Sequence, residues 1–154
     1  MFDQNPFPTE DTDRHAIWDL LVGRDSEFFL SGDWSLVEND YIDAGFLGID
    51  ASGHSEPSHW KIGFPTLADY RQAAIAGQLS QSDFAEDLTA AWLRCQSLTE
   101  IQIAGDVALA HKRLRGRIKR IDGTRLELGW TSIFFLRRSP HSWKITGFVG
   151  YLPL

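Results

Sequence analysis

Apolar residues recur at helical spacing near the start of the chain. Between residues 17 and 29 they repeat every three or four positions, which predicts a helix that buries one face. Asp11 or Thr12 can cap the start of this helix, because a short polar side chain accepts one of the free backbone N–H groups there. Gly32 marks its end, since glycine readily adopts the left-handed conformation that closes a helix.

Shorter segments with a regular pattern follow. Residues 41–49 predict a first strand, and residues 66–77 predict a helix that Thr66 caps. Apolar residues between positions 82 and 92 return to spacings of three and four. A further helix is therefore predicted over residues 82–92.

The period of the pattern changes after residue 97, where polar and apolar residues begin to alternate. Asp122-Gly123 is a strong hairpin signal between two of the alternating segments. On the returning strand the even positions are apolar, with Ser132 as the exception. Three long strands are predicted, at residues 107–121, 126–136 and 143–151.

Helices come first and strands afterwards, which indicates an α+β fold rather than alternating β-α-β units. We predict one domain over residues 10–154. Residues 1–9 contain two prolines and are predicted to form an extended N-terminal arm.

Composition narrows the class of protein. The chain has 154 residues, of which 43% are hydrophobic, enough for one globular domain. No apolar run approaches the roughly 20 residues of a membrane span, so we expect no membrane association. The single cysteine, Cys95, excludes an internal disulfide and favours a reducing, cytoplasmic setting. A net charge of −6 argues against a nucleic-acid partner.

Basic residues are concentrated at positions 112–120, within a predicted strand. One interpretation is a track for phosphate or nucleic acid. We favour a solvated strand face, because the chain as a whole is acidic and no aromatic residue interleaves the basic ones.

The order of several short motifs resembles the nuclear transport factor 2 superfamily, and its bacterial SnoaL-like members in particular, over residues 12–152. The motifs are Ser31-Gly32-Asp33-Trp34, Asp43-Ala44-x-Phe46, Gly105-Asp106-Val107-Ala108 and Trp143-Lys144-Ile145. The resemblance implies a curved, mostly antiparallel sheet with the N-terminal helices packed in its concave face. It also implies a cone with a central, mostly apolar pocket, and a homodimer that forms through the outer sheet face.

The isomerases of that superfamily are not matched at their catalytic positions. The resemblance places their helix-one tyrosine at Asp25 and their general base at Gly48. Isomerase activity is therefore not carried over to this chain.

Two other residues are candidates for proton transfer. Asp50 follows the predicted first strand and could lie near the mouth of the pocket, where burial would raise its pKa. The alternative, which we favour, is an exposed loop carboxylate, because Asp is rarely buried unpaired. His111 lies in the middle of a long strand, and the alternation leaves open whether it points into the pocket or outward.

Seven rings are candidates for the wall of a ligand-binding cavity, since large aromatic side chains dominate such sites. They are Trp18, Phe46, Trp60, Tyr70, Trp92, Trp130 and Phe134. We expect no metal at His54-x-Glu56-x-x-His59, because that segment lacks a helical frame, and we expect no cofactor.

Two functions follow from these expectations. The first is binding of a small, largely apolar molecule, with acid/base chemistry of the isomerase, dehydratase or cyclase type as an option. The alternative is a non-catalytic association module that uses the outer sheet face. An enclosed cavity of some hundreds of Å³ with an inward titratable group would favour the first, and a filled interior the second.

Overall fold

The computed structural model describes residues 4–154, and part of the predicted arm, residues 1–3, lies outside them. Residues 4–10 contain neither helix nor strand. Asn5 donates hydrogen bonds to the carbonyl of His15 and to Asp19, which holds this segment against the first helix.

The predicted first helix is confirmed, with one irregularity. Helix α1 (Thr12–Trp18) continues through a π-helical segment (Asp19–Arg24) into α2 (Asp25–Ser31). The Asp11 side chain caps the start by accepting from the N–H of Arg14. Gly32 ends the helix in the left-handed conformation, with φ of 74°.

Six strands form one curved, mixed sheet in the order β2-β1-β6-β5-β4-β3. β1 and β6 pair in parallel, and the other neighbours pair antiparallel. The strands are β1 (Leu47–Asp50), β2 (Lys61–Phe64), β3 (Gln96–Ala104), β4 (Val107–Lys119), β5 (Arg125–Arg138) and β6 (Trp143–Leu152). The long strands and the Asp122-Gly123 turn were therefore predicted correctly.

Two predicted segments were wrong in extent. The strand predicted at residues 41–49 is limited to β1, because Gly45 has a φ of 79° and turns the chain before it. The helix predicted from residue 82 begins at Leu88, where the Asp87 side chain caps α4 (Leu88–Arg94). Phe84 lies outside it and bridges to Arg120 at the end of β4.

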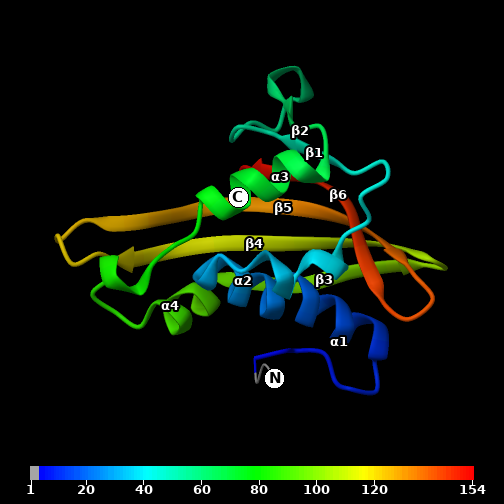
Figure 1. Cartoon of the computed structure of the whole chain (residues 1–154), viewed down its shortest axis with the longest axis horizontal. Coiled ribbons are helices and arrows are strands. Elements are labelled where there is room, and N and C mark those ends of the chain that lie inside the picture. The colour runs from blue at the N-terminus through cyan, green and yellow to red at the C-terminus, as the bar shows by residue number, and fades with distance from the viewer. Residues whose placement is uncertain (1–3) are drawn as a thin grey trace.

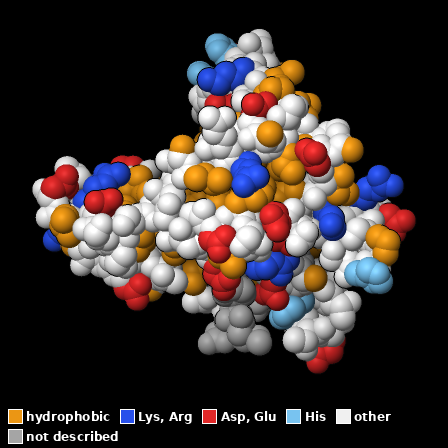
Figure 2. Space-filling view, in the orientation of Figure 1, with side chains coloured by type: hydrophobic (Ala, Val, Ile, Leu, Met, Phe, Trp, Pro, Cys, Tyr) orange, Lys and Arg blue, Asp and Glu red, His pale blue; other side chains and the backbone are white. Residues whose placement is uncertain are grey.

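The helices lie in the concave face of the sheet, which confirms the predicted α+β architecture. Figure 1 shows α1 and α2 running along the long strands, and α3 (Leu67–Ala76) near β1 and β6. The loop between β1 and β2 projects from this body (Figures 1 and 2) and contains His54 and His59. Within residues 4–154, no helix is long and apolar enough to span a bilayer.

Two clusters of buried apolar residues fill the space between helices and sheet. The larger one joins the first helix to β3, β4 and β6, and includes Leu21, Phe28 and Phe148. The smaller one lies under α4 and includes Trp92 and Leu114. Phe29 packs against both, so the boundary between the clusters lies beside it.

Asp13 connects the first turn of α1 to the end of the sheet through hydrogen bonds. Its carboxylate accepts two hydrogen bonds from the Arg138 guanidinium, at 2.7 and 3.0 Å, and one from the Trp143 indole at 3.0 Å. These donors, Arg138 first, lower the pKa of Asp13 from 3.8 to about 2.

Replacing Asp13 by asparagine should therefore weaken folding in a pH-dependent way. The native carboxyl has the lower pKa, so its contribution is complete above about pH 4 and is lost as the pH falls toward 2. At pH 7 we expect D13N to lower the free energy of unfolding by about 1 kcal/mol, because the site is partly exposed and screened. Urea denaturation across this pH range measures the effect.

Asp106 provides the matched control, since it also contacts Arg138, at 3.5 Å, but is largely exposed. D106N should change the unfolding free energy little at any pH. A D13N effect that stayed constant from pH 7 to pH 2 would contradict the assignment.

Candidate functional site

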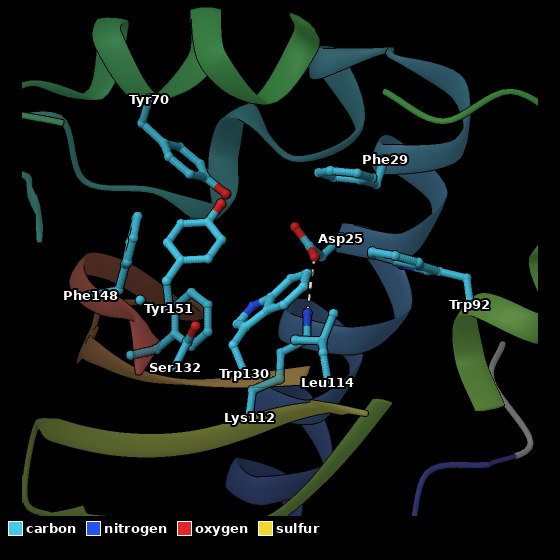
Figure 3. Close-up of a pocket in the computed structure, with 12 residues that line it drawn as sticks. Asp25, Phe29, Tyr70, Trp92, Lys112, Leu114, Trp130, Ser132, Phe148 and Tyr151 are labelled. Atoms are coloured by element: carbon cyan, nitrogen blue, oxygen red, sulfur yellow. Dashed lines mark hydrogen bonds and ion pairs between the residues drawn. The ribbon is translucent and has the colours of Figure 1, made fainter. Parts of the chain in front are cut away.

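A pocket of about 100 Å³ lies at the boundary between the two apolar clusters. Side chains from α2, α3, α4, β4, β5 and β6 converge on it (Figure 3). Its lining is Asp25, Phe29, Tyr70, Trp92, Lys112, Leu114, Trp130, Ser132, Phe134, Phe148, Gly150 and Tyr151. The pocket is smaller than the hundreds of Å³ expected of an enclosed ligand cavity, but it does contain inward titratable groups.

Lys112 is the unexpected member of this lining. The even positions of β4 face the helices, and the residues around it on that face, Ala110 and Leu114, are buried. Lys112 itself is 4% exposed. Lysine is almost never buried to this degree unless its ammonium group is paired.

Two acceptors from the first helix pair with the ammonium group. Its Nζ donates to the carbonyl oxygen of Leu21 at 2.6 Å and to Asp25 Oδ2 at 3.1 Å. Leu21 lies in the π-helical segment. In a regular α-helix the N–H of Asp25 would donate to the carbonyl of Leu21, but here it donates to the carbonyl of Val22. The helix irregularity thus leaves a carbonyl available to the lysine.

Asp25 keeps one oxygen for the pocket. Oδ2 accepts a hydrogen bond from Lys112 Nζ, whereas Oδ1 accepts no hydrogen bond from the part of the chain that the structure describes. Figure 3 shows this second oxygen directed into the space between Tyr70 and Phe29. A carboxylate in this position can accept a proton or a hydrogen bond from a bound molecule.

Phenol groups face the carboxylate across the pocket. Burial raises the pKa of Tyr70 above its ordinary value, and the negative charge of Asp25 raises it further. Burial, and after it the negative charges of Asp50 and Asp25, raise the pKa of Tyr151. Both hydroxyls therefore stay protonated at neutral pH and can donate hydrogen bonds to a ligand.

Tyr151 stands at the rim with a strained backbone. It has a φ of 58°, in the left-handed region that only glycine adopts freely, and its side chain is 42% exposed. Its ring lies against Trp130, with 5.5 Å between the ring centroids. Strain of this kind persists where the surroundings fix the conformation, and it is common at binding sites.

The structure brings together four of the seven predicted wall residues, namely Tyr70, Trp92, Trp130 and Phe134. The other three lie elsewhere. Trp18 and Phe46 are buried in the larger apolar cluster. Trp60 lies in the β1–β2 connection and donates to the carbonyl of His54.

The two predicted proton-transfer residues do not line the pocket. Asp50 ends β1, and its Oδ1 accepts from the N–H of Ser52 at 2.8 Å. His111 is at an odd position of β4, on the outer face, and lies 3.5 Å from Glu100 of β3. The open question of its orientation is thus answered by the neighbouring Lys112, which takes the inward position.

The sequence prediction missed the two charged residues that do face the pocket. Lys112 was grouped with the basic run that follows it, although its even position matches the buried Ala110 and Leu114. Asp25 was noted only as a mismatch to the tyrosine of the isomerases. Strand parity could have identified Lys112, whereas nothing in the sequence marks the π-helical segment.

The histidine-rich loop shows stacked rings rather than a ligand set. The imidazoles of His54 and His59 lie 4.3 Å apart, and His59 is 3.7 Å from Glu56. Among residues 4–154, no three His, Cys, Asp or Glu side chains converge as a metal site would require. Cys95 is buried, and burial raises the pKa of its thiol.

Removing one partner of the Lys112–Asp25 pair should be costly, and removing both should cost less than the sum. K112M leaves the Asp25 carboxylate and the Leu21 carbonyl unpaired, and D25N leaves a buried ammonium without its negative counterpart. We expect each to lower the free energy of unfolding by about 2 kcal/mol, with the double variant at least about 1 kcal/mol better than additive. Guanidinium denaturation measures all three.

The exposed pair Arg117–Glu127, with 3.0 Å between Nε and Oε2, is the control. The corresponding cycle, R117M with E127Q, should show little coupling. Additive effects at Lys112 and Asp25 would mean that the pair is not coupled in the folded protein.

No family model matches the chain, and no curated protein matches it in sequence. Solved structures do resemble it. An NTF2-like protein with a cystatin-like fold from Novosphingobium aromaticivorans has 16% identity over 93% of this chain and 82% of its own, with a TM-score of 0.56. A conserved protein from Planctomyces limnophilus has 15% identity over 96% of this chain and 98% of its own, with a TM-score of 0.61.

A third similar structure is an NTF2-like protein from Streptomyces avermitilis, provisionally described as a dehydratase. It has 14% identity over 94% of this chain and 98% of its own, with a TM-score of 0.57. At such identities the likeness concerns the fold alone. The chain has the NTF2-like, cystatin-like fold that its sequence motifs predicted.

Proposed function

We propose that this protein binds a small, largely apolar molecule in its pocket and transfers a proton on that molecule through Asp25. The observation that supports this proposal is the Lys112–Asp25 pair at the base of an aromatic pocket, with one carboxylate oxygen directed at the ligand space. This role replaces the one that the sequence suggested for Asp50 and His111.

A buried ion pair of this kind is a poor device for stability alone. Apolar side chains of similar volume often stabilise a protein as well or better than a buried pair does. The other even positions of β4 nearby are apolar, so the sheet face does not require a charge at position 112. A charged pair that opens onto a pocket is instead typical of a functional site.

The pair supplies two complementary groups for proton transfer next to a carbonyl. Asp25 Oδ1 accepts the proton from carbon, and the electron pair of the broken C–H bond moves onto the carbonyl oxygen. The Lys112 ammonium and the Tyr70 hydroxyl are placed to stabilise that negative charge. Asp25 then returns the proton, and the aromatic wall limits the access of water.

The size of the pocket restricts the ligand. A cavity of about 150 Å³ in another protein holds one benzene ring, so a space of about 100 Å³ holds less than a full ring in its resting state. The remainder of a ligand would extend past Tyr151 at the rim. We therefore expect a molecule built on a single small ring or a short chain.

A second proposal concerns the outer face of the sheet. Leu109 and Phe135 are cross-strand partners there and are 40% and 42% exposed, beside Val107 at 54%. An apolar patch on a strand surface is a plausible contact for a second copy of the chain. A homodimer formed this way is compatible with a ligand pocket on the concave side.

We also propose a cytoplasmic location. The one thiol, Cys95, is buried and takes part in packing, as in proteins of a reducing compartment.

Acetophenone in D2O tests the proton transfer, because its methyl protons lie next to a carbonyl. We expect the wild-type protein to accelerate their exchange for deuterium about a hundredfold over D25N, as measured by proton NMR. D50N and H111Q are the matched controls and should exchange at the wild-type rate. Exchange equal to buffer for the wild type, or unchanged in D25N, would refute the proposed role.

A charged side chain placed among the exposed apolar residues Val107, Leu109 and Phe135 tests the proposed dimer contact. L109E and F135E should convert a dimer into a monomer, as measured by sedimentation equilibrium, because each places a carboxylate in an apolar contact. R117E changes the charge of the same face away from the patch and should leave the dimer intact. A wild-type chain that is monomeric at all concentrations would exclude this contact.

A further inference from the structure

We propose that the pocket selects a neutral head group that offers a hydrogen-bond acceptor and a donor on two atoms bonded to the same carbon, such as a primary carboxamide, and rejects carboxylates. The inference rests on the proposed ligand pocket and specifies the class of molecule that it takes. It follows from one N–H donor of Lys112 and one acceptor oxygen of Asp25 that remain without a partner in this pair.

The ammonium group of Lys112 has one donor to spare. It carries three N–H groups and accepts nothing. Two donors are used, by the Leu21 carbonyl and by Asp25 Oδ2. The third is left for an acceptor oxygen of the ligand, since Lys112 lines the pocket.

Asp25 has a free acceptor oxygen that complements the free N–H donor of Lys112. As a carboxylate it only accepts, and its Oδ1 has no donor within residues 4–154. The spare donor and the spare acceptor belong to groups whose bonded atoms are 3.1 Å apart. A head group whose acceptor and donor atoms are bonded to the same carbon can therefore engage both at once.

The charges around the pocket disfavour an anion. Lys112 and Asp25 are the charged residues among its lining, and they neutralise each other. A carboxylate ligand would have to share Lys112 with Asp25 or displace it, which would place two negative charges together in a poorly solvated site. Burial raises the pKa of Tyr70 and Tyr151, and the negative charge of Asp25 raises it further in both, at Tyr151 after that of Asp50.

The rest of the lining fits an apolar body on such a head group. Phe29 and Trp92 stack on one side, with 5.2 Å between centroids and 7° between planes. Tyr70 and Phe148 pack edge to face on the other side, with 5.2 Å between centroids. Figure 3 shows the Asp25–Lys112 pair between these two walls.

Benzamide, benzoate and toluene are suitable probes, because they share one ring and differ in the head group. We expect the wild-type protein to bind benzamide at least about tenfold more tightly than either of the others, in titrations followed by NMR. Toluene lacks the hydrogen bonds, and benzoate adds a negative charge next to Asp25.

D25N provides the selective test. It removes the negative charge but keeps an amide oxygen as an acceptor, so Lys112 is no longer neutralised. Benzoate should then bind at least as tightly as benzamide. E100Q is the matched control, because it removes one carboxylate from the outer face, where Glu100 pairs with Arg113. It should keep the wild-type preference.

The outcomes separate this inference from the proposed function. Binding of toluene or benzoate as tight as that of benzamide in the wild type would overturn the head-group inference and leave the pocket in place. Binding of none of the three would contradict the pocket itself. The wild-type ranking decides the inference even where D25N does not fold.

Discussion

The need to pair the Lys112 ammonium group constrains the structure around it. This charge lies on a strand face with Ala110 and Leu114, so it requires acceptors from the helix that covers it. The π-helical segment provides the Leu21 carbonyl, and the first residue of α2 provides a carboxylate. Because Asp25 and Phe29 are one helical turn apart, the same arrangement turns a ring toward the pocket. The irregular helix, the ion pair and the pocket are thus one connected feature.

The fold could be predicted from the periodicity of the sequence because most elements have one buried face. The first helix and the long strands show periods near 3.6 and 2, and these survive in the structure. The predictions at residues 41–49 and 82–92 were too long for a local reason. A turn at Gly45 and a cap at Asp87 interrupt otherwise apolar segments. Such local choices depend on single residues, which a periodic pattern averages out.

The candidate site was only half visible in the sequence. Rings such as Trp92 and Trp130 stand out by their size, whereas Lys112 is hidden in a basic run. Neighbours on a strand point to opposite faces, so Lys112 and Arg113 do not share an environment, despite their similarity. Asp50 is the carboxylate that the strand pattern favours, but it lies outside the pocket lining and accepts a hydrogen bond from the N–H of Ser52. The geometry that makes Asp25 available depends on a helix irregularity that leaves no pattern in the sequence.

The Lys112–Asp25 ion pair beneath the pocket opposes the filling of the pocket by an apolar side chain. An apolar side chain that filled the space would remove solvent from Asp25 Oδ1 and from the third N–H of Lys112, which costs free energy unless new partners appear. The rings around the space are themselves held in place, Phe29 by Trp92 and Tyr70 by Phe148. They cannot collapse onto the pair without losing these contacts. Any ligand that displaces the solvent must therefore return hydrogen bonds to the pair, so the pocket favours molecules with a polar head over pure hydrocarbons.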